Sequence, residues 1–177
     1  MIEETWMYAH ELAWLFNRAK EMASIVEIGS WKGRSTEILL KGCKGKVYAV
    51  DHWRGSPAEL GSGYMGQELA RIDVFEEFLK RVGSFPNLSV LKMPSAEAAK
   101  QFDRGSVDMV FIDAGHDYAS VMKDLEAWRS IPAKLLCGHD AGSGWPGVIR
   151  ALKDSGIDFE LTGVGTIWQS PSSTRQG

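Results

Sequence analysis

The chain has 177 residues, of which 44% are hydrophobic and 24% charged, and its formal net charge is −3. This length suits one domain, and the composition excludes disordered, collagen-like and disulfide-rich proteins. The weak negative charge gives no electrostatic reason to expect a nucleic-acid partner. No apolar run approaches the ~18–20 residues of a membrane span. The acidic N-terminus differs from a basic signal peptide, and Cys43 and Cys137 form no CxxC motif, so we expect a cytoplasmic protein without membrane contact.

Helical and strand-like segments alternate along the chain. Apolar residues at helical spacing predict helices, and short apolar runs that end at Gly or Asp predict strands. The predicted helices cover residues 5–23, 33–40, 67–82, a short segment from Ser95, 118–128 and 146–152. The predicted strands cover residues 24–28, 46–50, 88–91, 107–112, 133–137, 157–161 and 164–168. Gly42 is expected to end the second helix.

This alternation predicts an α/β fold, a Rossmann-like doubly wound sheet that is mostly parallel. The last two strands follow each other without a helix, so we expect one of them to be antiparallel. We predict one domain over residues 1–177, with an N-terminal helix in 1–23 and a flexible tail at 170–177. The glycine-rich segment 54–66 is either a lid over the site or a loop without function.

Ligands of an open parallel sheet bind outside the carboxyl ends of its strands. A dinucleotide fingerprint GxGxxG starting at Gly29 needs glycine at positions 31 and 34, where this chain has Trp31 and Arg34. No GxxxxGK[ST] phosphate loop occurs either. The loop therefore favours a nucleoside ligand without phosphates over NAD or ATP. Asp51, which ends the second strand 22 residues after Gly29, can accept both hydroxyls of a ribose. The alternative is that Asp51 only caps a loop.

Four segments carry a resemblance to a known family: VEIGSWKGRST (26–36), VYAVDHW (47–53), DMVFIDAGHDYASVMKDLEAW (108–128) and GHDAGSGWPGV (138–148). With them the chain resembles class I S-adenosylmethionine-dependent methyltransferases. It is most similar to the small-molecule O-methyltransferase group that includes the cephalosporin hydroxylase-like and macrolide sugar O-methyltransferases. The resemblance implies a seven-stranded sheet with an antiparallel last strand, S-adenosyl-L-methionine as the cofactor and a small-molecule hydroxyl as the acceptor.

The resemblance also implies roles for single residues. Glu27, Gly29 and Ser30 would hold the methionine part of the cofactor, and Asp51 its ribose. Ser95 and Ala96 would lie beside the adenine. The predicted cofactor-binding set is completed by Gly33, His52 and Asp113.

Asp113 and Asp140 end the predicted fourth and fifth strands. Neighbouring strands lie ~4.8 Å apart, so these two carboxylates would emerge side by side. They would repel each other unless they are protonated or bridged by a cation, and Mg²⁺ suits carboxylate ligands. The alternative is that each aspartate caps a helix.

Two histidines flank these acids. The resemblance implies that Asp113 is a metal ligand and catalytic residue, and that His116, three residues later, is the general base. Some family members have two acids where this chain has His139 and Asp140. We therefore predict Asp113, His139 and Asp140 as the metal ligands, with a base or packing role as the alternatives for His139.

The expected reaction is in-line attack of a substrate oxygen on the sulfonium methyl group, with the hydroxyl activated by a metal and by His116. Three other functions stay open: a metal-independent methyltransferase, a nucleoside-binding protein without turnover and an NAD-dependent oxidoreductase. Trp53, Tyr64 and Trp145 would either line an acceptor pocket or pack in the core. The N-terminal helix, with Trp6 and Trp14, would pack on the sheet or on a second subunit of a homo-oligomer.

Overall fold

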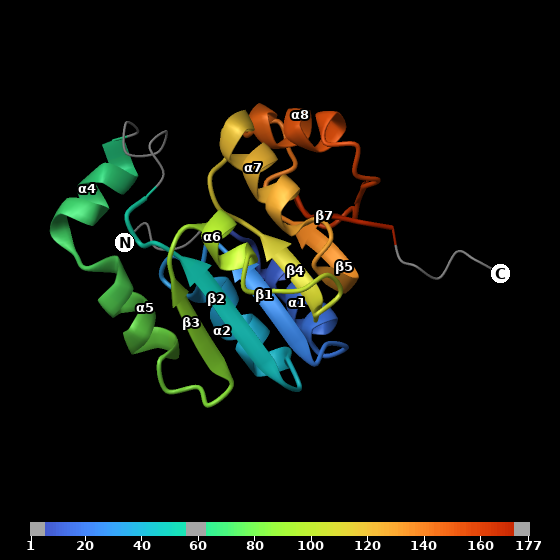
Figure 1. Ribbon diagram of the computed structural model, residues 1–177. Helices are drawn as coiled ribbons and strands as arrows, with labels where there is room; N and C mark the ends of the chain where they lie inside the picture. The colour runs from blue at the N-terminus through green and yellow to red at the C-terminus, as the bar shows by residue number, and fades with distance from the viewer. Residues whose placement is uncertain (1–5, 56–62, 172–177) are drawn as a thin grey trace.

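The computed structural model describes residues 6–55 and 63–171 (Figure 1). Within these residues seven strands form one sheet in the order β3-β2-β1-β4-β5-β7-β6. The strands are β1 Ser24–Ile28, β2 Lys46–Asp51, β3 Leu88–Lys92, β4 Val107–Ile112, β5 Pro132–Gly138, β6 Glu160–Leu161 and β7 Trp168–Gln169. The first five are parallel, and β7 lies antiparallel between β5 and β6. The predicted Rossmann-like architecture is confirmed.

Helices cover both faces of the sheet (Figure 1). They are α1 Ala9–Ala19, α2 Arg34–Gly42, α4 Gly63–Arg71, α5 Val74–Val82, α6 Ser95–Ala99, α7 Tyr118–Trp128 and α8 Pro146–Asp154. Side chains of α1, α2 and α5 share a core with Ile25 and Met109, whereas those of α6, α7 and α8 pack with Val26 and Val110. Successive strand residues thus face opposite cores, as the two-residue repeat of a strand requires.

The predicted single helix over 67–82 is wrong, because two helices, α4 and α5, occupy this region. Asp73 is extended, with φ −79° and ψ 101°, and its carboxylate accepts hydrogen bonds from the backbone N–H groups of Phe75 and Glu76. Aspartate is a strong N-cap, so it starts a new helix where apolar spacing alone suggests continuity. Of the predicted lid 54–66, residues 56–62 lie outside the described residues, and residues 63–66 belong to α4.

The N-terminal helix is shorter than predicted, since α1 spans Ala9–Ala19, and Thr5 lies outside the described residues. Apolar spacing predicts a buried face that includes Trp6, Ala13 and Ala19. Ala19 is buried, but Trp6 and Ala13 are exposed, whereas Glu11 and Leu15 are buried. The last two strands are also shorter than the predicted 157–161 and 164–168, since β6 and β7 cover only two residues each. Of the tail 170–177, residues 172–177 lie outside the described residues.

Gly42 is the last residue of α2, so the helix ends there as predicted, and a Cβ there would crowd the Cβ of Ala19 and the carbonyl oxygen of Phe16. The glycine therefore allows α2 to pack closely on α1. Among the described residues, none forms a helix that is both long and apolar enough to span a membrane. Cys43 and Cys137 are buried free thiols.

Candidate functional site

The carboxyl ends of the five parallel strands meet at one edge of the sheet. Ile28 pairs with Val50 of β2 on one side and with Ile112 of β4 on the other. Ile112 in turn pairs with Gly138 of β5. The residues that follow these positions therefore lie in one row, and the expected neighbourhood of strand ends is present.

Gly29 stands at the centre of this row. Its φ of +91° is unfavourable for any residue with a Cβ, and a Cβ here would collide with the carbonyl oxygen of Asp113. Its N–H donates to the carbonyl of Val50 at 2.9 Å, and the N–H of Asp113 donates to the carbonyl of Ile28 at 2.8 Å. The glycine loop and the Asp113 loop are thus packed directly against each other.

Glu27 lies under the glycine loop and is fully buried. One carboxylate oxygen, Oε2, accepts hydrogen bonds from the hydroxyls of Ser30 and Thr36. The other, Oε1, has no hydrogen-bond partner within the described residues. Burial raises the pKa of Glu27 to about 7, although the hydroxyls of Ser35, Thr36 and Ser30 act in the opposite direction. An unsatisfied buried acceptor is costly in a folded protein, so Oε1 is suited to a donor that comes from outside the chain.

Asp51 ends β2, and its carboxylate binds both the loop that follows β1 and the loop that follows β2. Its Oδ2 accepts from the N–H of Trp31 at 2.9 Å, and its Oδ1 accepts from the N–H of Trp53 at 2.7 Å. Both tryptophans have positive φ, 45° and 55°, a conformation rare for bulky residues and frequent at functional sites. Each carboxylate oxygen can accept a second hydrogen bond. Asp51 therefore caps its loop and retains acceptor capacity for a ligand.

The other predicted cofactor residues differ in what they contact. Gly33 is the N-cap of α2 at φ +81° and faces the side chains of α5. Helix capping and packing therefore explain a glycine at this position. Ser95 accepts a hydrogen bond from the indole N–H of Trp128 at 2.8 Å and so fastens α6 to α7. Ala96 is half-buried beside it. His52 is half-buried, and its Nδ1 accepts from the N–H of Arg54 at 3.0 Å. Their roles toward a cofactor stay predictions.

Asp113, His139 and Asp140 form a cluster in which one potential ligand atom of each residue lies within 4.8 Å of the others. Nδ1 of His139 lies 3.6 Å from Oδ1 of Asp113 and 3.3 Å from Oδ2 of Asp140. Burial lowers the pKa of His139, but the contacts with Asp113 and Asp140 outweigh it and raise the pKa to about 11. The structure thus brings together the three residues predicted as metal ligands.

His116 lies on the other side of Asp140, with Nε2 2.7 Å from Oδ2 of the carboxylate. Its ring stacks on the indole of Trp145, with centroids 4.2 Å apart and planes 21° apart. Asp140 itself has a φ of 61°, and its N–H donates to the hydroxyl of Thr166 at 3.2 Å. Of the two predicted catalytic residues, Asp113 therefore belongs to the acidic cluster and His116 contacts it.

The three aromatic residues expected either at an acceptor pocket or in the core differ in their surroundings. Trp53 is buried, and its ring packs on Phe75 and Phe78 with centroids 4.7 and 4.8 Å away, so it belongs to the core. Trp145 is 43% exposed and lies on His116. The side chain of Tyr64 lies outside the described part of the chain.

Glu11 of α1 was not predicted. It is 1% exposed, and Oε1 lies 3.0 Å from Nε2 of His139. The only sequence signal for Glu11 is its place four positions before Leu15, on the face of α1 that becomes buried.

Residues 26–140 match the family model described as a methyltransferase domain. The chain belongs to the family of methyltransferase domains. This match confirms the predicted resemblance to class I S-adenosylmethionine-dependent methyltransferases and the assignment of the protein as an enzyme of this type. A comparison with curated proteins finds no match.

Solved structures share the fold of this methyltransferase. A methyltransferase from Geobacter sulfurreducens has a TM-score of 0.65 and 16% identity, covering 93% of this chain and 78% of that one. An O-methyltransferase from Bacillus cereus in complex with SAH has a TM-score of 0.60 and 16% identity, covering 93% and 81%. A SAM-dependent O-methyltransferase from Thermotoga maritima has a TM-score of 0.59 and 15% identity, covering 89% and 54%, so the chain spans about half of it. At these identities the likeness establishes the fold alone.

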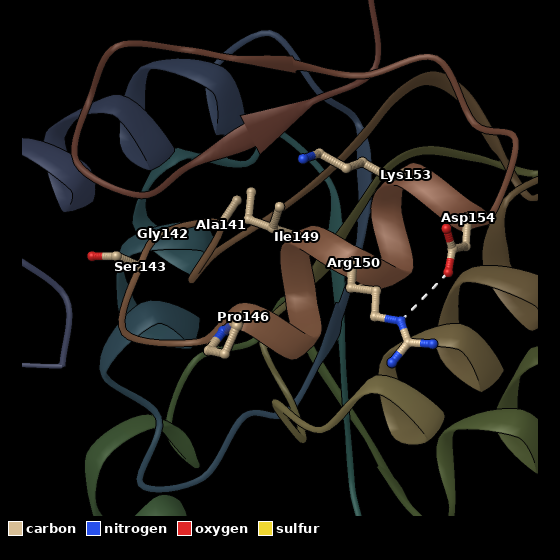
Figure 2. Close-up of a pocket in the computed structure, with 8 residues that line it drawn as sticks. All are labelled: Ala141, Gly142, Ser143, Pro146, Ile149, Arg150, Lys153 and Asp154. Atoms are coloured by element: carbon tan, nitrogen blue, oxygen red, sulfur yellow. Dashed lines mark ion pairs between the residues drawn. The ribbon is translucent and has the colours of Figure 1, made fainter.

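A groove of about 490 Å³ begins at Ala141, the residue after Asp140, and extends along α8 (Figure 2). Its lining includes the side chains of Arg150 and Lys153, and Arg150 pairs with Asp154 at 3.7 Å. The lining residues are Ala141, Gly142, Ser143, Pro146, Ile149, Arg150, Lys153 and Asp154. The groove is a candidate entry for a small molecule.

Proposed function

We propose that the protein transfers the methyl group of S-adenosyl-L-methionine to a hydroxyl of a small molecule, with a divalent cation, such as Mg²⁺, as a second cofactor. One observation carries the proposal. The loop expected to hold the cofactor and the loop that begins the acidic cluster are in direct contact, since Gly29 packs on the backbone of Asp113. A methyl donor at one loop therefore lies beside acid–base chemistry at the other.

The residues of β1 and β2 fit the cofactor. The buried and unpaired Oε1 of Glu27 suits the ammonium group of the methionine part, which is a strong hydrogen-bond donor. The remaining acceptor capacity of Asp51 suits the two hydroxyls of a ribose. The SAH-bound O-methyltransferase from Bacillus cereus, which shares the fold, supports the same cofactor class. Ser30, Gly33, His52, Ser95 and Ala96 complete the proposed binding set.

When bound, S-adenosylmethionine supplies a sulfonium methyl group for in-line transfer to an oxygen nucleophile. A neutral hydroxyl is a weak nucleophile, so its proton needs an acceptor as the new bond forms. His116 accepts this proton, and the carboxylate of Asp140, 2.7 Å from Nε2, stabilises the resulting imidazolium. The stacked ring of Trp145 restricts the imidazole to one plane and shields it from water on one side.

Asp113, His139 and Asp140 fit a hard divalent cation, since they offer two carboxylates and an imidazole nitrogen at one point. A cation bound there would lower the pKa of an acceptor hydroxyl. The protein contributes the close approach of the two carboxylates, which repel each other until a positive charge lies between them.

One observation favours a second candidate, a methyltransferase that needs no metal. Nδ1 of His139 already lies within 3.6 Å of both carboxylates, so an imidazolium can neutralise the acidic pair. Chelation with EDTA separates the two candidates. A metal-dependent enzyme loses transfer and regains it with Mg²⁺, whereas the metal-independent one is unaffected.

Turnover tests the proposed function. The protein is incubated with S-adenosylmethionine, Mg²⁺ and a panel of sugars, phenols and hydroxylated metabolites, and S-adenosylhomocysteine formation is measured. We expect formation that depends on one acceptor class and that falls to background in Asp113→Ala. Tight binding of S-adenosylhomocysteine without transfer to any acceptor would instead support a nucleoside-binding protein without turnover.

A further inference from the structure

The carboxylate of Glu11 reaches the acidic cluster from α1, a helix outside the segment that matches the methyltransferase family model. Its Oε2 accepts from the N–H of Tyr8 at 2.8 Å, and its Oε1 accepts from the N–H of Thr166 at 2.8 Å. A buried carboxylate is costly unless its oxygens are hydrogen-bonded, and here both are. Burial raises the pKa of Glu11, but these two N–H groups and His139 outweigh it, so the pKa is lowered overall.

The chain leaves space for this carboxylate at a specific point. Gly165 has a φ of +55°, and a Cβ on it would collide with the carboxylate of Glu11. The next residue, Thr166, also holds the segment that follows β5. Its carbonyl accepts from the N–H of Ala141 at 2.9 Å, and its hydroxyl accepts from the N–H of Asp140 at 3.2 Å. Glu11 is therefore fixed to the same short loop that fixes the backbone of Asp140.

Between Glu11 and the acidic pair lies the ring of His139, which is 5% exposed. Nε2 lies 3.0 Å from Glu11, while Nδ1 faces Asp140 and Asp113 at 3.3 and 3.6 Å. A group that accepts a hydrogen bond from one ring nitrogen of a histidine fixes the orientation of the ring, and so fixes where the other nitrogen points. With Glu11 at Nε2, the ring is held with Nε2–H toward Glu11 and Nδ1 toward the acids.

We propose that Glu11 is a positioning residue of the site: it holds the Nε2 proton of His139 and so presents Nδ1 to Asp113 and Asp140. The significance of this position rests on the proposed function, whereas the orientation of the ring can be tested without cofactor or acceptor. Glu11 acts through His139, whose ring lies between it and the two aspartates.

The first test is the imidazole ¹⁵N–¹H spectrum of histidine-labelled protein, with His139→Gln used for assignment. We expect a His139 Nε2–H signal that exchanges slowly with water in the wild type and is lost in Glu11→Gln. The matched control is Asp108→Asn, because Asp108 ties the segment after α1 to β4 through the N–H of Ala23 at 2.6 Å, at the opposite end of the sheet. The signal should persist in this variant.

If Glu11→Gln does not fold, Glu11→Asp replaces it, since the shorter side chain keeps the charge but withdraws from His139. An unchanged His139 signal in the folded Glu11 variant, or a wild type without this signal, would overturn the proposal. Thermal unfolding of all variants shows whether the control is destabilised to a similar degree.

The second test is titration with Mn²⁺, followed by its electron paramagnetic resonance signal, and with S-adenosylhomocysteine. We expect the Mn²⁺ dissociation constant to rise about 10- to 100-fold in Glu11→Gln, as for other residues that orient a metal ligand, with unchanged S-adenosylhomocysteine affinity. Equal Mn²⁺ affinities would overturn the proposed link to the cluster. A wild type that binds neither probe contradicts the proposed function instead, and the ¹⁵N–¹H signal then decides on Glu11.

Discussion

Nε2 of His116 lies 2.7 Å from Oδ2 of Asp140, and the same carboxylate oxygen lies 3.3 Å from Nδ1 of His139. Asp140 therefore joins the two histidines. Burial raises its pKa, but the contacts with His116 and His139 outweigh it and hold the pKa at about 2. A carboxylate that stays ionised can support a positive charge that forms on His116 during proton transfer.

Replacing the proposed base should slow transfer without weakening cofactor binding. For His116→Gln we expect a decrease in kcat of about 10²–10⁴-fold, the usual contribution of a general base. The S-adenosylhomocysteine dissociation constant, measured by calorimetry, should stay at the wild-type value. The matched control is His10→Gln, since His10 is exposed and stacks on Tyr8 with centroids 5.6 Å apart. Equal losses in the two variants would exclude His116 as the base.

Asp51 has a structural role and a proposed binding role, and one matched variant separates them. Asp51 and Asp73 each accept two backbone N–H groups, but only Asp51 lies at the proposed ribose site. Both Asp51→Asn and Asp73→Asn should lower the melting temperature. Only Asp51→Asn should weaken S-adenosylhomocysteine binding, by about 10- to 100-fold, since a hydrogen bond to a charged group contributes about 1.5–3 kcal/mol. Weakening of similar size in Asp73→Asn would mean that loss of stability explains the effect.

The raised pKa of Glu27 predicts a pH dependence of cofactor binding. Its pKa of about 7 in the folded protein means that the carboxyl is protonated below this pH. Binding of an ammonium group needs the carboxylate, so S-adenosylhomocysteine affinity should decrease by up to about tenfold per pH unit as the pH falls below 7. Titration calorimetry at pH 5 to 8 measures this. Glu27→Gln should bind more weakly at pH 8 and lack the dependence, and an identical profile in this variant would contradict the assignment.

Glu27 also predicts a pH dependence of stability. The pKa is raised on folding from 4.5 to about 7, so the folded state binds more protons than the unfolded state in this interval. The free energy of unfolding should therefore fall as the pH rises from about 4.5 to about 7 and lose no more from this group above it. Urea unfolding across this range compares the wild type with Glu27→Gln. The decrease should be absent from the variant.

The sequence was sufficient for much of the site because strand ends can be read locally. Asp113 and Asp140 each follow an apolar run, and parallel strands bring such ends to one edge, so their proximity follows from the fold. The double role of Asp51 could not be predicted. It depends on the positive φ of Trp31 and Trp53, for which nothing in the local sequence provides a signal.

The error at α1 has a physical cause, which is that tertiary contacts decide what a helix buries. The apolar spacing of α1 suggested a face with Trp6 and Ala13, yet the helix buries Glu11 and Leu15, because Thr166 and His139 supply partners for the carboxylate. These partners lie about 130 to 155 positions away along the chain, so no local pattern could reveal them.

The most direct measurement is a crystal structure of the protein with S-adenosylhomocysteine and Mg²⁺. It should show the ribose hydroxyls on Asp51, the amino group on Oε1 of Glu27 and the sulfur directed toward Asp113 and Asp140. A nucleoside bound elsewhere, with Glu27 and Asp51 making no contact to it, would contradict the proposed site.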